Sequence, residues 1–203
     1  MKKYVRSPSL WEFFVIAVVP PLLLAVHLLP SKIHPYVLIL VVAVVILIAR
    51  LRNYTLESLS ISIPRLDFVS VAVFLSVISL FGIWFIFLRE TYANNEANTL
   101  GLYTLARSML YSFLQVFLYQ SYLMKIGEKI FRNDFANIGI NATSFACMHI
   151  FYRLALGDYL LIGVAGLGFN LYYRYVKRNF WILGLFHFST NMMAIHLGMF
   201  HPG

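Results

Sequence analysis

The stretch QVFLYQSYLM, residues 115–124, places two glutamines and two tyrosines inside a long apolar segment. Amide side chains are costly where a helix faces lipid, and they usually face the interior of a helical bundle when they occur there. The 203-residue chain is 61% hydrophobic and 12% charged, whereas soluble domains carry about a quarter charged residues. The sequence therefore predicts an all-α integral membrane protein in which this stretch faces the interior.

Seven apolar segments approach the roughly 20 residues that a helix needs to cross a bilayer. They run over residues 10–29, 35–50, 68–88, 100–124, 141–156, 158–176 and 181–199. We expect one membrane domain over residues 1–203, with N-terminal spans and loops in 1–99 and the core helices in 100–200. The basic and apolar N-terminus resembles a signal peptide, but it lacks a small-x-small cleavage pattern, which favours a retained first span.

The distribution of Lys and Arg predicts the orientation of these spans. Twelve of them fall in one set of alternate loops, and only Lys32, Arg89 and Arg153 fall in the other set. The first set comprises the N-terminus, 50–67, 125–135 and 174–180. The positive-inside rule then places the N-terminus in the cytoplasm and the C-terminus outside the plasma membrane. Topology and anionic lipid account for the net charge of +8, so no nucleic-acid partner is expected.

Two polar segments separate the predicted spans. The segment RNYTLESLSISIPRLD, residues 52–67, is either an amphipathic helix on the inner membrane surface or an ordinary loop. Residues 89–100 are predicted to form an outer loop.

Later in the chain, Gly163, Gly166 and Gly168 share one span, where small residues favour close packing of neighbouring helices. A single cysteine, Cys147, excludes an internal disulfide and a Cys-rich zinc site.

Few polar side chains lie inside the predicted spans, and such side chains tend to mark function. They are Arg107, Gln115, Gln120, His149, His187 and Asn191. His187 and Asn191 are four residues apart and share one helix face, as do Phe145 and His149. Asn191 can therefore hydrogen-bond His187 or a shared ligand. His196 and His201 are expected near the outer end, where water is available.

The depths of three of these side chains in the bilayer can be compared. At a rise of 1.5 Å per residue, Gln115, His149 and His187 each lie roughly 9–14 Å from the inner ends of their predicted spans. The sequence therefore predicts that the three side chains share one level, on the cytoplasmic side of the bilayer centre.

The stretches FACMH and HFSTN carry a family resemblance. The chain resembles the CPBP family of intramembrane proteases, also called the CAAX-protease, bacteriocin-processing or Abi family, over about residues 105–196. Members carry three motifs on successive core helices: Glu-Glu-x-x-x-Arg, Phe-x-x-x-His and His-x-x-x-Asn. Phe145 and His149 match the second motif, and His187 and Asn191 match the third. The resemblance implies a CAAX-protease-like helix bundle in the C-terminal half.

The first motif is altered in this chain. Gln115 and Val116 stand where the family has two glutamates, Gln120 stands at or beside the arginine, and Tyr122 matches a tyrosine that follows it. The resemblance implies that a glutamate and a histidine activate a water, while the second histidine and the asparagine stabilise the oxyanion. A glutamine cannot accept that proton, and the loss of a general base typically costs about 10²–10⁴-fold in rate.

Other acidic side chains offer poor substitutes for the missing base. Glu128, Asp134 and Asp158 are predicted to lie in loops. Glu12, near the inner end of the first span, is the carboxylate that could substitute most easily.

These observations leave three functions open. The favoured one is a catalytically impaired relative that binds a membrane peptide or protein partner through the former active-site cavity. The alternative is an active intramembrane endopeptidase with an altered first motif. The third, a small transporter, is motivated by Arg107 and the polar cluster. Candidate catalytic residues are His149, His187, Asn191 and Gln115, and candidate substrate- or partner-binding residues are Phe145, Gln120, Arg107 and Tyr122.

No cofactor is expected in this chain, and the lipid bilayer is its expected surroundings. A metal held by His149 and His187 is the less favoured option. Two histidines with an asparagine and a glutamine make a poor zinc set, because catalytic zinc sites usually have three histidine, carboxylate or thiolate ligands.

Overall fold

The computed structural model describes residues 10–25, 33–61, 72, 75, 102–150, 154, 156–176 and 178–196. Every regular element in these residues is helical, and no β-strand occurs among them, in agreement with the predicted all-α class. The predicted span over 68–88 and the predicted outer loop over 89–100 lie outside the described residues, apart from residues 72 and 75.

Ten helical segments are described. They are α1 Leu10–Ala17, α2 Val19–Ala25, α3 His34–Leu51, α5 Leu102–Val116, η2 Phe117–Leu123, α6 Met124–Ile130, α7 Asp134–Cys147, α8 Leu156–Leu171, η4 Tyr172–Val176 and α9 Phe180–His196. The two η segments are π-helices that continue the preceding α-helices. None of the described helices has both the length and the apolarity needed to cross a membrane.

The segment predicted as a first span is divided into α1 and α2 at Val18. Pro20 and Pro21 follow immediately. Proline has no N–H to donate, and its ring crowds the carbonyl four residues earlier, so two prolines disturb a regular helix at this point. The prediction of one continuous helix over 10–29 is therefore wrong, because the helix is interrupted between α1 and α2.

The helix predicted over 35–50 is observed as α3, which has a proline in its first turn and Arg50 in its last. Turns follow it over residues 52–60, and Asn53 and Ser60 adopt positive φ angles of 56° and 60°. The polar segment 52–67 was expected to be either an amphipathic helix or an ordinary loop, and its described part agrees with an ordinary loop. The remaining residues, 62–67, are not described.

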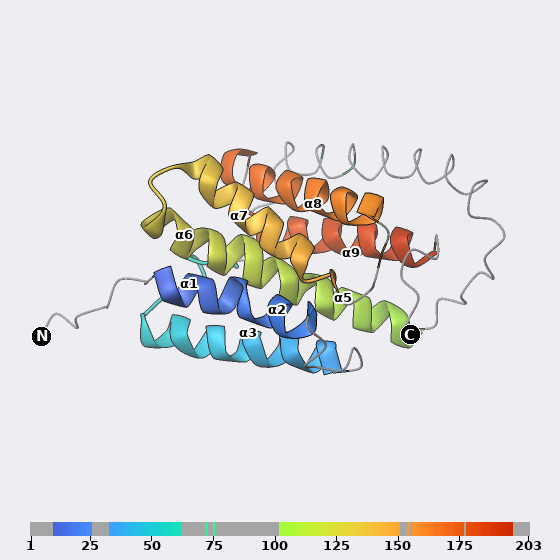
Figure 1. Cartoon of the computed structure of the whole chain (residues 1–203), viewed down its shortest axis with the longest axis horizontal. Helices are drawn as coiled ribbons and strands as arrows, with labels where there is room; N and C mark the ends of the chain where they lie inside the picture. The colour runs from blue at the N-terminus through green and yellow to red at the C-terminus, as the bar shows by residue number, and fades with distance from the viewer. Residues whose placement is uncertain are drawn as a thin grey trace, which may run out of the picture.

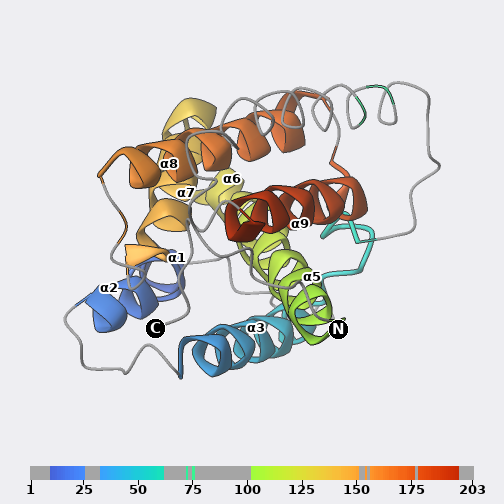
Figure 2. The same cartoon turned by 90° about the vertical axis from the view of Figure 1, so that its right-hand side faces the viewer.

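The long helical run formed by α5, η2 and α6 passes through the middle of the bundle (Figures 1 and 2). α5 packs against α9 on one side and against α3 on the other, while α7 and α8 lie side by side. Apolar side chains of α1 and α3, including Phe13, Leu38 and Val42, share one buried core with η2. The N-terminal helices therefore cover the segment that contains the opening stretch.

Charged pairs gather where α6, α7 and η4 meet. The Arg174 guanidinium lies 2.7 Å from the Asp134 carboxylate and 3.4 Å from that of Glu128, and Arg178 also pairs with Glu128. The prediction that these carboxylates lie in loops is wrong, because Glu128 belongs to α6 and Asp134 begins α7. Asp158 likewise lies in the first turn of α8.

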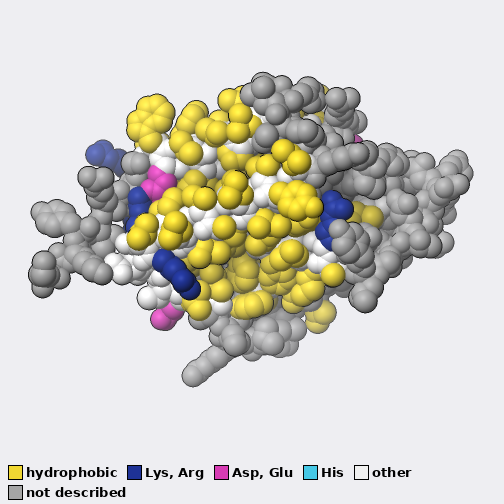
Figure 3. Space-filling view, turned by 90° about the horizontal axis from the view of Figure 1, so that it is seen from below, with side chains coloured by type: hydrophobic (Ala, Val, Ile, Leu, Met, Phe, Trp, Pro, Cys, Tyr) yellow, Lys and Arg dark blue, Asp and Glu magenta, His cyan; other side chains and the backbone are white. Residues whose placement is uncertain are grey.

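A broad apolar surface covers the outside of the N-terminal helices (Figure 3). Its side chains include Trp11 of α1, which is 75% exposed, and Leu40 and Leu47 of α3, which are 65% and 58% exposed. Soluble monomers rarely expose contiguous apolar patches larger than a few hundred Å², and larger patches mark contact with a membrane or a partner.

Candidate functional site

The helical run over 102–130 carries both glutamines of the opening stretch. It changes from α to π geometry directly after Val116, and each residue of η2 is buried. π-helical segments are rare and are frequently found at functional sites. The altered geometry therefore begins two residues after Gln115, at Phe117.

Gln115 is 6% exposed, and its Oε1 is buried without a hydrogen-bond partner among the described residues. Ser112 and Tyr119 lie one turn before and one turn after it on the same helix face. Both are fully buried, and the Tyr119 hydroxyl also has no partner in the described part of the chain. This face presents buried polar atoms to α7 and α9.

His149 lies just beyond the end of α7. Its Nδ1 donates to the Phe145 main-chain oxygen at 2.9 Å, and the residue is 4% exposed. That carbonyl would accept the His149 N–H if the helix continued, but here the His149 N–H donates to Ala146. The imidazole therefore satisfies a carbonyl that the helix end leaves open.

The predicted position of His149 within its helix is wrong. The helix expected over 141–156 is observed as α7 at Asp134–Cys147, so His149 follows the helix end instead of lying inside it. The helix begins early because the Asn133 side chain accepts a hydrogen bond from the Phe135 N–H at 2.8 Å, which caps the N-terminus.

Phe145 lies between the two histidines. Its ring centroid is 5.1 Å from that of His149 and 5.2 Å from that of His187. Both contacts are edge-to-face, the arrangement that aromatic rings prefer. Gly166 of α8 makes room for this ring, because a Cβ there would lie 2.8 Å from Phe145 Cδ1. Of the three glycines expected to aid packing, Gly168 has no atom of the described residues within 4 Å of such a Cβ.

α9 supplies His187 and Asn191. His187 is 2% exposed, and its Nδ1 has no hydrogen-bond partner among the described residues. The Asn191 Nδ2 donates to the Ser112 hydroxyl at 2.9 Å, and that hydroxyl donates to the Ser108 carbonyl at 2.8 Å. Asn191 is thus held by α5 rather than by His187.

We call Gln115, Phe145, His149, His187 and Asn191 the histidine site. The structure joins the second and third motifs through ring contacts with Phe145, and it joins Asn191 to the helix face of Gln115 through Ser112. Residues from three separate helical segments of the chain thus meet at one place.

Three other candidate residues have different neighbours. The Gln120 Nε2 donates to Asn170 Oδ1 at 3.2 Å. The Tyr122 hydroxyl donates to Glu12 at 2.5 Å, and Glu12 also pairs with Arg52. Tyr122 lies seven residues beyond Gln115, about 10 Å along the helix. Glu12 is therefore held about two helical turns from Gln115.

Arg107 is exposed on α5, and its guanidinium lies 5.5 Å from the centre of the Tyr111 ring. It is eight residues from Gln115, about 12 Å along the helix. His196 ends α9, with its side chain outside the described set, and His201 is not described.

Sequence reasoning missed Ser112, Asn137 and Asn141. The two asparagines are both buried on α7. Their four-residue spacing is the same signal that singled out His187 and Asn191, so the pattern could have identified them. Ser112 stands one turn before Gln115, where a search of the same face would have found it.

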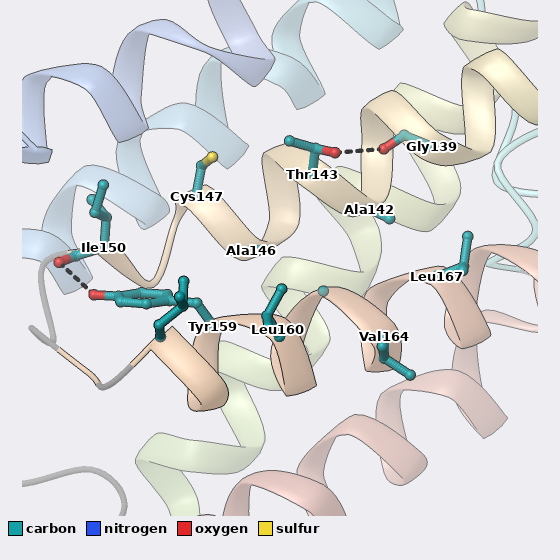
Figure 4. Close-up of a pocket in the computed structure, with 12 residues that line it drawn as sticks. Gly139, Ala142, Thr143, Ala146, Cys147, Ile150, Tyr159, Leu160, Val164 and Leu167 are labelled. Carbon is teal, nitrogen blue, oxygen red and sulfur yellow. Dashed lines mark hydrogen bonds between the residues drawn. The ribbon is translucent and has the colours of Figure 1, made fainter.

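An apolar groove of about 560 Å³ runs between α7 and α8 (Figure 4). Thr143 and Cys147 line it from α7, and Leu160 and Val164 line it from α8. Thr143 follows Asn141 by two positions, and Cys147 follows Phe145 by two positions, so each is turned by about 200° around the helix from a residue of the buried face. The groove therefore lies on the opposite side of α7 from the histidine site.

The described residues contain no group of three His, Cys, Asp or Glu side chains placed to hold a metal ion. What the histidine site offers is a set of neutral hydrogen-bonding groups. Carbonyl oxygens, ring nitrogens and amides of this kind can receive or donate hydrogen bonds to a polar ligand.

Comparison with known proteins finds a family match for most of the C-terminal half. Residues 97–193 match the family model described as "Type II CAAX prenyl endopeptidase Rce1-like". The match includes all five residues of the histidine site, and it confirms the resemblance drawn from the motifs. No significant match was found among curated proteins or among solved structures.

Proposed function

Because residues 97–193 match the Rce1-like CAAX protease family model, we propose that the chain is a catalytically impaired relative that binds a membrane peptide at the histidine site. The family is membrane-associated, which supports a membrane location for the chain. The proposal assigns a binding role to a site whose first motif has Gln115 and Val116 in place of the two glutamates.

One observation carries the proposal: a buried amide, Gln115, stands where the family pattern has a glutamate. Its Oε1 is enclosed and can accept a hydrogen bond, but an amide cannot take a proton from water at neutral pH. A peptide N–H would satisfy this oxygen. The Asn191 amide and the His187 ring supply further hydrogen-bonding groups, and Phe145 supplies an apolar wall.

The acidic side chains paired in the structure do not replace the missing base. Glu12 is occupied by Arg52 and Tyr122, and Glu128 and Asp134 are occupied by Arg174 and Arg178. These pairs hold their carboxylates at the end of the bundle that contains the α6–α7 turn.

The experiment uses a fluorogenic prenylated CAAX peptide and the full chain in lipid nanodiscs. We expect the wild-type chain to bind the peptide without cleaving it. The triple variant Gln115→Glu, Val116→Glu and Gln120→Arg restores the motif and should gain cleavage that His149→Ala abolishes. Gln115→Asn is the matched control, because it keeps an amide and should gain no cleavage.

Two outcomes would contradict the proposal. Cleavage by the wild-type chain that His149→Ala abolishes would overturn the proposal in favour of an active endopeptidase. A specific feature supports that alternative: with Nδ1 donating to Phe145, the Nε2 of His149 is the ring atom able to accept a proton. Absence of both binding and cleavage in all variants would reject both readings.

We also propose that the bundle is embedded in the plasma membrane with its N-terminus in the cytoplasm. The exposed apolar side chains of α1 and α3 and the clustering of Lys and Arg in alternate segments support this arrangement. Single cysteines at residues 2 and 203, in a Cys147→Ser background, test it with a membrane-impermeant maleimide on intact cells. Labelling at residue 2 but not at residue 203 would contradict it.

A further inference from the structure

We propose that a second polar cluster, outside the histidine site, binds water inside the bundle. The amide cluster consists of Gln120 of η2, Asn137 and Asn141 of α7, and Asn170 of α8. Each of these residues is at most 1% exposed.

The first chain of amides begins at a main-chain carbonyl. The Ile138 oxygen can only accept, so the Asn170 side chain turns its Nδ2 toward it, at 3.3 Å. Asn170 Oδ1 must then face Gln120, and it receives the Gln120 Nε2 at 3.2 Å. This leaves Gln120 Oε1 buried, with no hydrogen-bond partner in the described residues.

The second chain has the same polarity. The Met124 main-chain oxygen accepts from Asn137 Nδ2 at 3.1 Å, so Asn137 Oδ1 faces away and accepts from Asn141 Nδ2 at 2.8 Å. Asn141 Nδ2 also donates to the Asn137 carbonyl at 2.9 Å. Asn141 Oδ1 is consequently left buried and, within the described part of the chain, unpartnered.

The two backbone carbonyls thus fix the orientation of every side-chain amide in the cluster. Reversing any of these amides would place two acceptor oxygens face to face. An unmade hydrogen bond at a buried oxygen costs about 1–3 kcal/mol, so each of the two terminal oxygens requires a donor. A cation is disfavoured, because no carboxylate belongs to the cluster and an uncompensated buried charge is far more costly. Water is a neutral donor that satisfies buried polar groups in this way.

The amide cluster lies on a track that leads to the histidine site. Asn137, Asn141, Phe145 and His149 follow one another at four-residue steps and share one face of α7 and its extension. Each step rises about 6 Å, so the track covers about 18 Å from the charged end of the bundle. On the facing helix, Tyr119 contacts Phe145 at a centroid distance of 5.6 Å. The Tyr119 hydroxyl, which has no hydrogen-bond partner in the described part of the chain, adds a polar group beside this track.

The experiment exposes the full chain in nanodiscs to a brief X-ray pulse in ¹⁸O-labelled water and measures side-chain oxidation by mass spectrometry. Radicals formed from internal water label adjacent side chains. We expect Tyr119 to be labelled several-fold more than Tyr122, which is equally buried but whose hydroxyl is satisfied by Glu12. Equal or absent labelling of Tyr119 in the wild-type chain would overturn the proposal.

A variant identifies the amide cluster as the source. Asn141→Leu should reduce labelling of Tyr119 several-fold, whereas Thr143→Val, on the exposed face of α7, should leave it unchanged. Unchanged labelling in a folded Asn141→Leu chain would overturn the assignment. If this variant does not fold, the wild-type comparison still decides. The measurement needs neither peptide nor cleavage, so it stands or fails separately from the proposed function.

Discussion

Gly127 of α6 lies so close to Asn137 of α7 that no side chain fits between the two helices. A Cβ at residue 127 would lie 2.7 Å from Asn137 Cγ and 3.0 Å from Nδ2, and closer still to Oδ1. Gly127→Ala must therefore move the asparagine. A moved Asn137 loses the hydrogen bond that it donates to the Met124 carbonyl and the one that it accepts from Asn141, and both bonds lie in the buried interior.

The magnitude follows from these two effects. Overpacking a buried contact costs about 1–3 kcal/mol, and an orphaned buried polar group costs about 1–3 kcal/mol more. Replacing glycine by alanine inside a helix recovers up to about 1 kcal/mol. We expect the free energy of unfolding to fall by about 1–5 kcal/mol in total.

Thermal unfolding of the full chain in detergent, followed by circular dichroism, measures the loss. For a chain of this size, the midpoint should fall by about 2–4 °C for each kcal/mol. Gly139→Ala on α7 is the matched control, because no atom of the described residues lies within 4 Å of its added Cβ. Equal midpoints for the two variants would refute the steric argument. So would a double variant with Asn137→Ala that is fully additive, since relief of the clash requires coupling.

Two further substitutions test contacts at α5. Gly184→Ala should lower the free energy of unfolding by about 1–3 kcal/mol, because its Cβ would lie 2.5 Å from Phe113 Cδ1. Gly168→Ala should be neutral in the same unfolding assay, because its Cβ would meet no atom of the described residues within 4 Å. Ser112→Ala should lower the free energy of unfolding by about 1 kcal/mol, because it removes the hydroxyl that accepts from Asn191. Ser112→Thr keeps a hydroxyl and should keep most of that stability. A Ser112→Ala chain as stable as the wild type would contradict this role.

Much of the helical framework could be predicted from the sequence. Apolar runs long enough for helices correspond to α3, α5 with η2, α8 with η4, and α9, and the ranges differ by a few residues at most ends. The exceptions have local causes. Proline breaks the first run, and the Asn133 cap starts α7 earlier than its apolar residues suggest.

The candidate site was partly predictable because motif spacing constrains helix faces. The four-residue intervals from Phe145 to His149 and from His187 to Asn191 indicated which side chains share a face. They could not indicate that the Phe145 ring would contact both imidazoles, because that depends on how closely α8 approaches at Gly166. Likewise, the π geometry of η2 involves backbone hydrogen bonds whose choice is set by packing with neighbouring helices rather than by local sequence.

The contact between Tyr122 and Glu12 joins the part of the chain that carries the family pattern to a part that does not. Phe13, Leu38 and Val42 bury apolar surface against the same region, so the helix run over 102–130 depends on partners from the first 51 residues. A chimaera that takes its C-terminal half from another family member would meet a foreign interface here. The two halves are therefore expected to exchange successfully only when the residues facing Tyr122 are transferred with it.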